Sequence, residues 1–239
     1  MLVRASDGSL ETFMLRRSAR SEFLPEMFVF PGGAVENGDV ALAQSHLLRT
    51  PASQHEEREP SEPAFEVAAL REAFEESGIL IAARRDGSAL RVEPDAAHAL
   101  RSSLLETKTS FVALLDELGA VLDARALLYF SHWVTPPQER RRFDTHFYLA
   151  VAPEEQHGSA DEIETHHGVW IAPAEALRRN AAGEFPLIFP TIKHLERLAA
   201  HDTLEALRAY AATKSIRVVH PVVEQGRHFG LPEDVRERW

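Results

Sequence analysis

The feature that most constrains this chain is a segment of helical length that is acidic on one side, apolar on the other, and closed by a glycine. Glu72, Glu75 and Glu76 stand at i, i+3 and i+4, so an α-helix places their carboxylates on one face, about 5–6 Å apart. Gly78 suits the left-handed position that ends a helix. The opposite face carries apolar side chains that would pack on a sheet: Val67, Leu70 and Phe74. We therefore predict a helix that packs through one face and presents clustered carboxylates on the other.

Clustered carboxylates repel one another, and a bound divalent cation is one reason for a sequence to gather them. Hard oxygen ligands of this kind suit Mg²⁺ or Mn²⁺. Taken alone, the string from Arg71 to Glu76 is more often a solvated acidic helix face. Here, however, an apolar segment from Met27 to Phe30 runs as a strand into Pro31-Gly32-Gly33 before the helix. This combination favours a binding site over a solvated face.

Gly33 and the stretch from Arg71 to Ile79 resemble the two ends of the sequence motif of the Nudix hydrolases. The resemblance implies an α/β (α+β) Nudix fold, in which a mixed β-sheet is sandwiched between helices. It also implies a hydrolase that cleaves a diphosphate linkage in a small-molecule nucleoside diphosphate derivative, with Mg²⁺ or Mn²⁺ as cofactor.

The same resemblance assigns roles to individual residues of the motif. Glu75 and Glu76 would be the principal metal ligands, Glu72 a ligand or the general base, and the Gly33 carbonyl an additional ligand. Arg71 would orient the glutamates through charge-assisted hydrogen bonds and not touch the substrate.

The middle of the motif departs from the family pattern. Gly33 and Arg71 are 38 positions apart, 24 more than in an uninterrupted motif, which indicates an insert at about residues 40–63. Counting forward from the glycine places the first acid of the motif at Asp39, whereas counting back from the arginine reaches the residue beside Glu62. The sequence leaves both acids as candidates.

The divided motif, together with Trp133-Val134-Thr135-Pro136 and the segment from Arg141 to Tyr148, resembles one branch of the Nudix hydrolases. That branch includes the peroxisomal coenzyme A diphosphatases and bacterial relatives. It implies coenzyme A or acyl-coenzyme A as substrate, with 3′,5′-ADP and a phosphopantetheine as products. The same motif also serves hydrolases of ADP-sugars, NADH and dinucleoside polyphosphates. Outside the enzymes, a non-catalytic, nucleotide-binding regulatory Nudix module is the alternative.

A cluster of arginines stands between two predicted strands of an otherwise acidic chain. Arg141 and Arg142, and with less weight Arg140, could hold a substrate phosphate through the planar guanidinium fork. The alternative is a solvated turn with ion pairs to Glu139 or Asp144.

A second group of polar residues precedes the predicted strand around Trp170. By family resemblance the loop there supplies another glutamate, for which Glu164 is the first candidate and Glu162 the second. His166 and His167 are adjacent, and neighbouring residues of a strand point to opposite faces. We therefore expect these histidines to lie on the surface or in a substrate loop rather than to chelate one ion together.

Composition limits the remaining possibilities. A chain of 239 residues that is 44% hydrophobic can form one domain, which we place at residues 1–239. Its formal net charge of −11 argues against a nucleic-acid groove, which needs many basic residues. The absence of cysteine, of a secretory leader and of an 18-residue apolar run leads us to expect a cytoplasmic protein without a membrane span.

Hydrophobic periodicity and the residues that end helices and strands predict the other secondary-structure elements. We predict a strand pair around the turn at residues 7–9, and a hairpin of strands at 127–134 and 143–151. A strand at 169–172 precedes a helix at 173–178. A helical insertion is expected at about 95–118, a short helix at 40–43 within the insert, and C-terminal helices at about 191–213. Residues 187–212 could form a homodimer surface or complete the core of the monomer.

Overall fold

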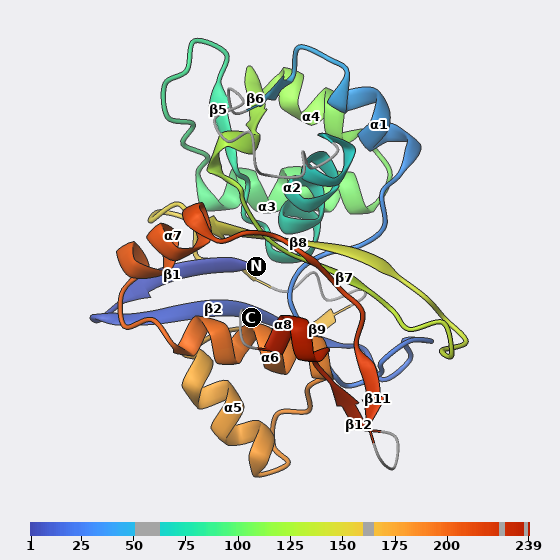
Figure 1. The fold of residues 1–239 in the computed structure, drawn as a ribbon. Coiled ribbons are helices and arrows are strands. Elements are labelled where there is room, and N and C mark those ends of the chain that lie inside the picture. The colour runs from blue at the N-terminus through green and yellow to red at the C-terminus, as the bar shows by residue number, and fades with distance from the viewer. Residues whose placement is uncertain (51–62, 160–164, 225–227, 237–238) are drawn as a thin grey trace.

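The computed structural model describes residues 1–50, 63–159, 165–224, 228–236 and 239 (Figure 1). Its elements in chain order are β1 (Leu2–Ser6), β2 (Ser9–Arg17), β3 (Phe28–Val29), α1 (Asn37–Ala43), β4 (Leu48–Arg49), α2 (Pro63–Ser77), β5 (Ala82–Arg84), α3 (Pro94–Leu105), α4 (Phe111–Glu117), β6 (Ala120–Asp123), a 3₁₀ turn (Ala124–Ala126), β7 (Leu128–Val134), β8 (Asp144–Val151), β9 (Thr165–Ile171), α5 (Pro173–Ala181), α6 (Phe189–Ala199), α7 (Leu204–Thr213), β10 (Val218–Val219), β11 (Val222–Glu224), β12 (His228–Gly230) and α8 (Glu233–Arg236).

A mixed seven-stranded sheet forms the middle layer, with strand order β10-β7-β8-β1-β2-β3 and with β9 also paired to β2. β1 and β2 are antiparallel around Asp7 and Gly8, which both have positive φ (49° and 78°). β7 and β8 form an antiparallel hairpin, and β8 joins β1 in parallel. The predicted strand pair and the predicted hairpin are therefore confirmed, and they are neighbours in one sheet.

Helices cover both faces of this sheet. Alternation along β2 sends Phe13 and Leu15 into one apolar cluster with α2 and α4, and Met14 into a second cluster with α5, α6 and α7. Figure 1 shows α2 and α4 on one side of the sheet and α5 and α6 on the other. The predicted sandwich is confirmed.

The C-terminal helices bury their apolar faces in the second cluster. Leu195 and Leu198 of α6, and Leu207 and Ala211 of α7, have no exposed surface. Of the two sequence-based alternatives for this region, completion of the monomer core is the one that these contacts support. The first of these helices begins two residues earlier than predicted, at Phe189, because Pro190 occupies an early helical position where its missing N–H is tolerated.

The divided motif folds as two pieces on either side of residues 51–62. β3 leads through the Pro31-Gly32-Gly33 loop into α1, which contains the short helix predicted at 40–43 and begins three residues earlier. α2 carries the three glutamates and ends before Gly78, whose φ of 74° is the left-handed conformation expected there. Residues 51–62 of the predicted insert lie outside the described residues, and Pro63 begins α2.

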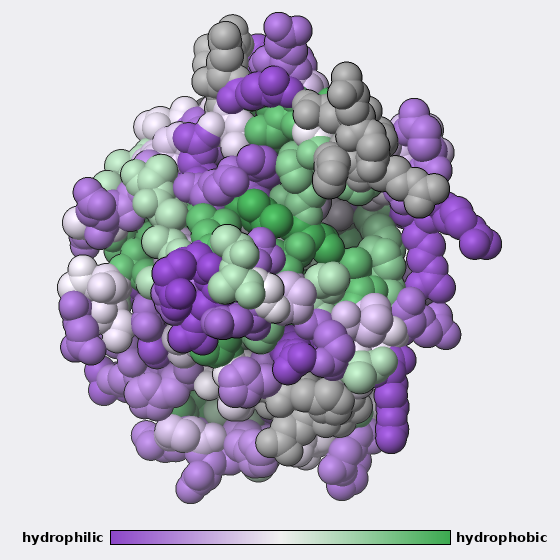
Figure 2. All heavy atoms as spheres, turned by 90° about the horizontal axis from the view of Figure 1, so that it is seen from below, coloured by the Kyte–Doolittle hydropathy of each residue, from purple (hydrophilic) through white to green (hydrophobic). Residues whose placement is uncertain are grey.

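The helical insertion is present as α3 and α4. Next to it the structure places a small sheet of order β4-β6-β5, none of whose three strands the sequence analysis predicted. Seen from below, the outline of the molecule is largely hydrophilic, and hydrophobic side chains gather toward the middle of the face (Figure 2). Within the described residues, no helix combines the length and the hydropathy that a membrane span requires.

Candidate active site

Arg71 is the centre of a charged cluster on α2. Its guanidinium donates to both carboxylate oxygens of Asp39, from Nε at 2.9 Å and from Nη2 at 3.0 Å. Nη1 donates to Glu72 and Glu75, each at 2.8 Å, and Nη2 also reaches the carbonyl oxygen of Ala34 at 3.0 Å. The side chain is 7% exposed. One buried guanidinium thus contacts three carboxylates and the glycine-rich loop.

Asp39 is the acid that the structure brings to the arginine. It lies in the first turn of α1, where its side chain also accepts a hydrogen bond from the Glu36 N–H at 2.8 Å. It is 2% exposed, and 32 residues separate it from Arg71. Glu62, the other candidate for the first acid, lies outside the described residues. Counting forward from Gly33 therefore leads to the acid that is paired with the arginine.

The glycine-rich loop lies directly on the carboxylates of α2. The N–H of Gly32 donates to Glu76 Oε2 at 2.7 Å. A Cβ atom added at Gly33 would fall 2.2 Å from Glu72 Oε1, well inside van der Waals contact. A side chain at this position would displace the Glu72 carboxylate from its present place beside Arg71, so both ends of the divided motif meet at one place.

The cluster carries more negative than positive charge. Four carboxylates, those of Asp39, Glu72, Glu75 and Glu76, surround one guanidinium, which leaves three negative charges if all of them are ionised. Burial raises the pKa of Glu72 to about 7, against the opposing effect of Arg71 and with reinforcement from Glu75. Burial also raises the pKa of Glu75, again opposed by Arg71.

Arg71 itself stays charged. Burial disfavours its cationic form, but the Asp39 hydrogen bond and the charges of Glu72 and Glu75 outweigh burial and raise its pKa. The donor set offered to a metal is made of oxygen atoms only, and a divalent cation would favour the ionised form of each carboxylate. The residues present therefore fit Mg²⁺ or Mn²⁺.

The arginines of the β7–β8 turn do not join this cluster in the structure. Arg141 is exposed and pairs with Glu22 at 3.3 Å, and Arg142 donates from Nε to the Thr135 carbonyl oxygen at 3.2 Å. Arg140 is exposed as well. These contacts are with Glu22 and the Thr135 carbonyl oxygen and not with Glu139 or Asp144, the partners named in the solvated-turn alternative, and Asp144 pairs with His132 instead.

The structure describes only some of the acids and histidines at and just before the start of β9. Glu162 and Glu164 lie outside the described residues, as does the side chain of His166. His167 is exposed on β9, opposite Arg16 of β2. The expectation that this histidine lies at the surface is confirmed.

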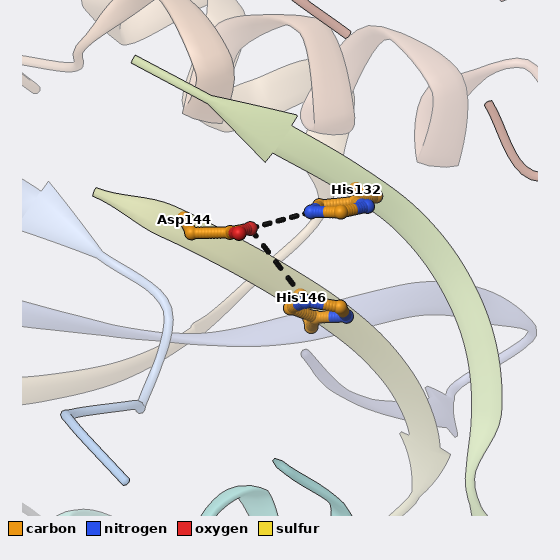
Figure 3. Close-up of side chains that lie close together, drawn as sticks. All are labelled: His132, Asp144 and His146. Carbon is orange, nitrogen blue, oxygen red and sulfur yellow. Dashed lines mark hydrogen bonds and ion pairs between the residues drawn. The ribbon is translucent and has the colours of Figure 1, made fainter. Parts of the chain in front are cut away.

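The sequence analysis missed a polar cluster on the β7–β8 hairpin. His132, Asp144 and His146 turn their side chains toward one another (Figure 3). Asp144 and His146 are two residues apart and so share a face of β8, and His132 stands opposite His146 in the register. This i, i+2 pair of metal-binding residue types was the available signal.

Comparison with known proteins places this fold and site in a class. A crystal structure of a Nudix hydrolase from Alicyclobacillus acidocaldarius superimposes with a TM-score of 0.73 at 29% sequence identity, covering 91% of this chain and 96% of that one. The family model described as the NUDT19 Nudix domain matches residues 41–198. The chain therefore belongs to the Nudix hydrolases, and among them to the NUDT19 Nudix domain family.

Curated relatives agree with this placement. The acyl-coenzyme A diphosphatase NUDT19 of Gallus gallus is 31% identical over 86% of this chain and 65% of its own length. The human protein of the same name is 27% identical over 85% of this chain and 64% of its own length. Putative nudix hydrolase 7 of Caenorhabditis elegans is 26% identical over 95% of this chain and 69% of its own length. The chain thus spans about two thirds of the length of these relatives.

Proposed function

We propose that this protein is a metal-dependent diphosphohydrolase whose substrate is coenzyme A or an acyl-coenzyme A. The observation that carries the proposal is the carboxylate cluster of α2, which holds a surplus of negative charge against the glycine-rich loop. A purely nucleotide-binding module has no need of such clustered oxygen ligands. Two of the relatives, from Gallus gallus and human, are named acyl-coenzyme A diphosphatases, which supports the choice of substrate.

In this proposal the residues of the divided motif hold Mg²⁺ or Mn²⁺. Glu75 and Glu76 are the principal ligands, and Glu72 and the Gly33 carbonyl complete the set. Bound divalent ions would neutralise the diphosphate oxygens and help to deprotonate a water molecule. Arg71 keeps the carboxylates of Glu72 and Glu75 in place, so little rearrangement is needed when the metal binds.

Further residues are assigned within the same proposal. Asp39 takes the place of the first acid of the motif, because it is the carboxylate that pairs with Arg71. Glu164 contributes a catalytic carboxylate from the segment before β9. Arg141 and Arg142 bind the 3′-phosphate that distinguishes coenzyme A from its dephospho form, for which their exposure leaves them accessible. We also propose that the chain forms a single domain, that the protein is cytoplasmic, and that it has no nucleic-acid partner. Formation of a homodimer is part of the same proposal.

The test is an assay of the purified protein with Mn²⁺ or Mg²⁺ and a substrate panel. The panel contains coenzyme A, acetyl-coenzyme A, ADP-ribose, NADH and diadenosine polyphosphates, and products are separated by chromatography. Release of 3′,5′-ADP is the expected result. If only another member of the panel is cleaved, the diphosphohydrolase activity is retained and the coenzyme A assignment is rejected. If no member is cleaved, the non-catalytic regulatory module is favoured.

A further inference from the structure

Two imidazoles and one carboxylate converge on the β7–β8 hairpin, outside the α2 cluster. Nε2 of His132 contacts Oδ1 of Asp144, and Nε2 of His146 lies 3.6 Å from the same oxygen. One ligand atom from each of the three residues lies within 4.8 Å of the other two. Figure 3 shows all three side chains directed toward one another from the two strands. Such a donor set of two nitrogens and one oxygen differs in kind from the oxygen-only set on α2.

The surroundings hold His146 with its Nε2 turned toward the cluster. Its Nδ1 is 2.8 Å from the hydroxyl of Tyr129, and the ring of Phe65 stacks on it at a centroid distance of 4.0 Å. A metal-ligating histidine is commonly held in this way by a hydrogen bond at its other ring nitrogen. Tyr129 and Phe65 therefore act as positioning residues for this imidazole.

The exposure of the three side chains suits an ion that enters from solvent. The side chains of His132 and His146 are 13% and 12% exposed, whereas that of Asp144 is 60% exposed. The two rings are also stacked, with centroids 4.1 Å apart. Because the two ring planes are within 27° of parallel, coordination of one ion by both Nε2 atoms requires one imidazole to turn out of the stack as well as a movement of the exposed carboxylate.

A simple hydrogen-bonded ion pair explains only part of the arrangement. It accounts for the contact between His132 and Asp144, but not for a second imidazole directed at the same carboxylate oxygen. Placing two imidazoles beside one another is unfavourable when both are protonated, and shared coordination of a cation removes that difficulty because each ring then binds as the neutral form.

We propose that His132, Asp144 and His146 form a second metal site, which binds a divalent transition-metal ion of the Zn²⁺ type. Imidazole nitrogen is a preferred ligand of Zn²⁺, whereas Mg²⁺ is bound through oxygen. Bond lengths of about 2.0–2.1 Å in a tetrahedral site separate neighbouring ligand atoms by about 3.3 Å, which requires a rotation of one imidazole together with a movement of Asp144. Three protein ligands leave the fourth position for water or an anionic oxygen.

The proposed site is separate from the carboxylates of α2. Phe65, which stacks on His146, lies seven residues before Glu72 on the same helix. Seven residues correspond to about 10 Å along a helix axis. The proposed Zn²⁺ site uses none of the α2 carboxylates as ligands, so it does not depend on the diphosphohydrolase proposal.

The test measures Zn²⁺ binding to the full chain by equilibrium dialysis in the presence of excess Mg²⁺, which occupies the oxygen ligands of α2. We expect the wild-type protein to bind one Zn²⁺ per chain. His132→Ala and His146→Ala should each weaken this binding at least tenfold. His98→Ala, at an exposed histidine of α3, is the matched control and should bind as the wild type does. Glu76→Gln should retain the Zn²⁺ site.

Two further measurements keep the proposal falsifiable. Asp144→Asn removes the ligand charge at an exposed position with nearly constant volume, so it decides the question if a histidine variant fails to fold. Co²⁺ substitution should give the intense visible bands of a tetrahedral site in the wild type and lose them in Asp144→Asn. Equal Zn²⁺ binding by the wild type and the hairpin variants, or loss of Zn²⁺ in Glu76→Gln, would overturn the proposal.

Discussion

Helices α2 and α6 lie on opposite faces of the sheet, and both bury polar side chains, but they do so in opposite ways. α2 gathers several carboxylates around the single guanidinium of Arg71. α6 buries one imidazole, that of His194, whose Nδ1 donates to the Pro190 carbonyl oxygen at 2.6 Å and whose Nε2 accepts from the Ser131 hydroxyl at 2.6 Å. Burial lowers the pKa of His194 to about 3, so this ring is neutral.

This difference distinguishes a candidate binding site, the carboxylate cluster of α2, from a purely structural contact, that of His194 on α6. The hydrogen bonds of His194 use both ring nitrogens and leave no charge, and they tie α6 to β7. A serine beside a histidine resembles an activated nucleophile, yet Ser131 and His194 are 2% and 0% exposed, so no substrate reaches them. The α2 cluster has more carboxylates than guanidinium groups beside a backbone loop, and under the proposed function a divalent cation balances this charge.

Removing the central cation of α2 should have the largest effect. Arg71→Gln leaves buried carboxylates without their partner and should lower the free energy of unfolding by about 3–5 kcal/mol. Urea denaturation of the metal-free protein measures this loss. Arg178→Gln on α5 is the matched control, since its ion pair with Glu175 is exposed and its loss should leave the stability near the wild-type value. A loss of less than about 1 kcal/mol for Arg71→Gln would remove the contrast between the two helices.

Removing one carboxylate should affect activity rather than folding. Glu76→Gln preserves volume and keeps an oxygen for the Gly32 N–H, but it removes a charge that the metal needs. We expect at least a hundredfold loss of turnover, or about 2.7 kcal/mol of barrier, at an unchanged melting temperature. Glu205→Gln on α7 serves as the control. A Glu76→Gln variant that keeps more than about a tenth of the wild-type rate would contradict its assignment as a metal ligand.

The two helices should also respond to pH with opposite signs. Because the pKa of Glu72 is raised to about 7 in the fold, the native state binds this proton more tightly than the unfolded chain does. When a chelator removes metal ions, the titration of Glu72 should lower the free energy of unfolding as the pH rises from 4.5 to 7, by up to about 1.4 kcal/mol per pH unit. Glu72→Gln should reduce that dependence, measured by denaturation across this range, and an unchanged slope would refute the burial of this carboxylate.

For His194 the free energy of unfolding should depend on pH with the opposite sign. Its pKa is lowered in the fold, so the unfolded chain binds the proton first, and stability is lost as pH falls from 6.5 toward 3. The expected slope is again up to about 1.4 kcal/mol per pH unit. His194→Phe should lower stability by a constant amount, since it leaves the Ser131 hydroxyl unsatisfied, and should flatten this part of the profile. A profile as steep as that of the wild type would show that another group titrates there.

The smallest effect is expected away from both helices. Arg142→Ala should raise KM a few-fold for a 3′-phosphorylated substrate and less for its dephospho form, because the lost contact is a single exposed charge. Arg208→Ala, at an exposed position on α7, controls for the change in net charge. Equal effects of Arg142→Ala on the two substrates would remove this arginine from the phosphate site.

Much of the α2 site could be predicted because its information is local. The spacing of the three glutamates and the position of Gly78 follow from helix geometry, and the structure has both. The choice between Asp39 and Glu62 was not local, since it depends on where an insert begins, and only the contact across the chain to Arg71 distinguishes them.

The hairpin cluster shows where sequence reasoning fails. Asp144 and His146 are visible as an i, i+2 pair, but their nearness to His132 depends on the strand register. That register shifts between Tyr129 and Ser131, and periodicity alone does not place such an irregularity. β6 was missed for a related reason, because four residues give too short an alternation to recognise.

The contact between Asp39 and Arg71 has a consequence for how this motif tolerates change in length. Closing 38 positions between Gly33 and Arg71, in place of 14, costs only about 0.9 kcal/mol of additional chain entropy. Removing one partner of the buried bidentate contact would cost the fold several times as much as that difference. The break in the motif is therefore a natural point of insertion, at which a reporter or a sensor domain could be grafted while both halves of the motif remain anchored to each other.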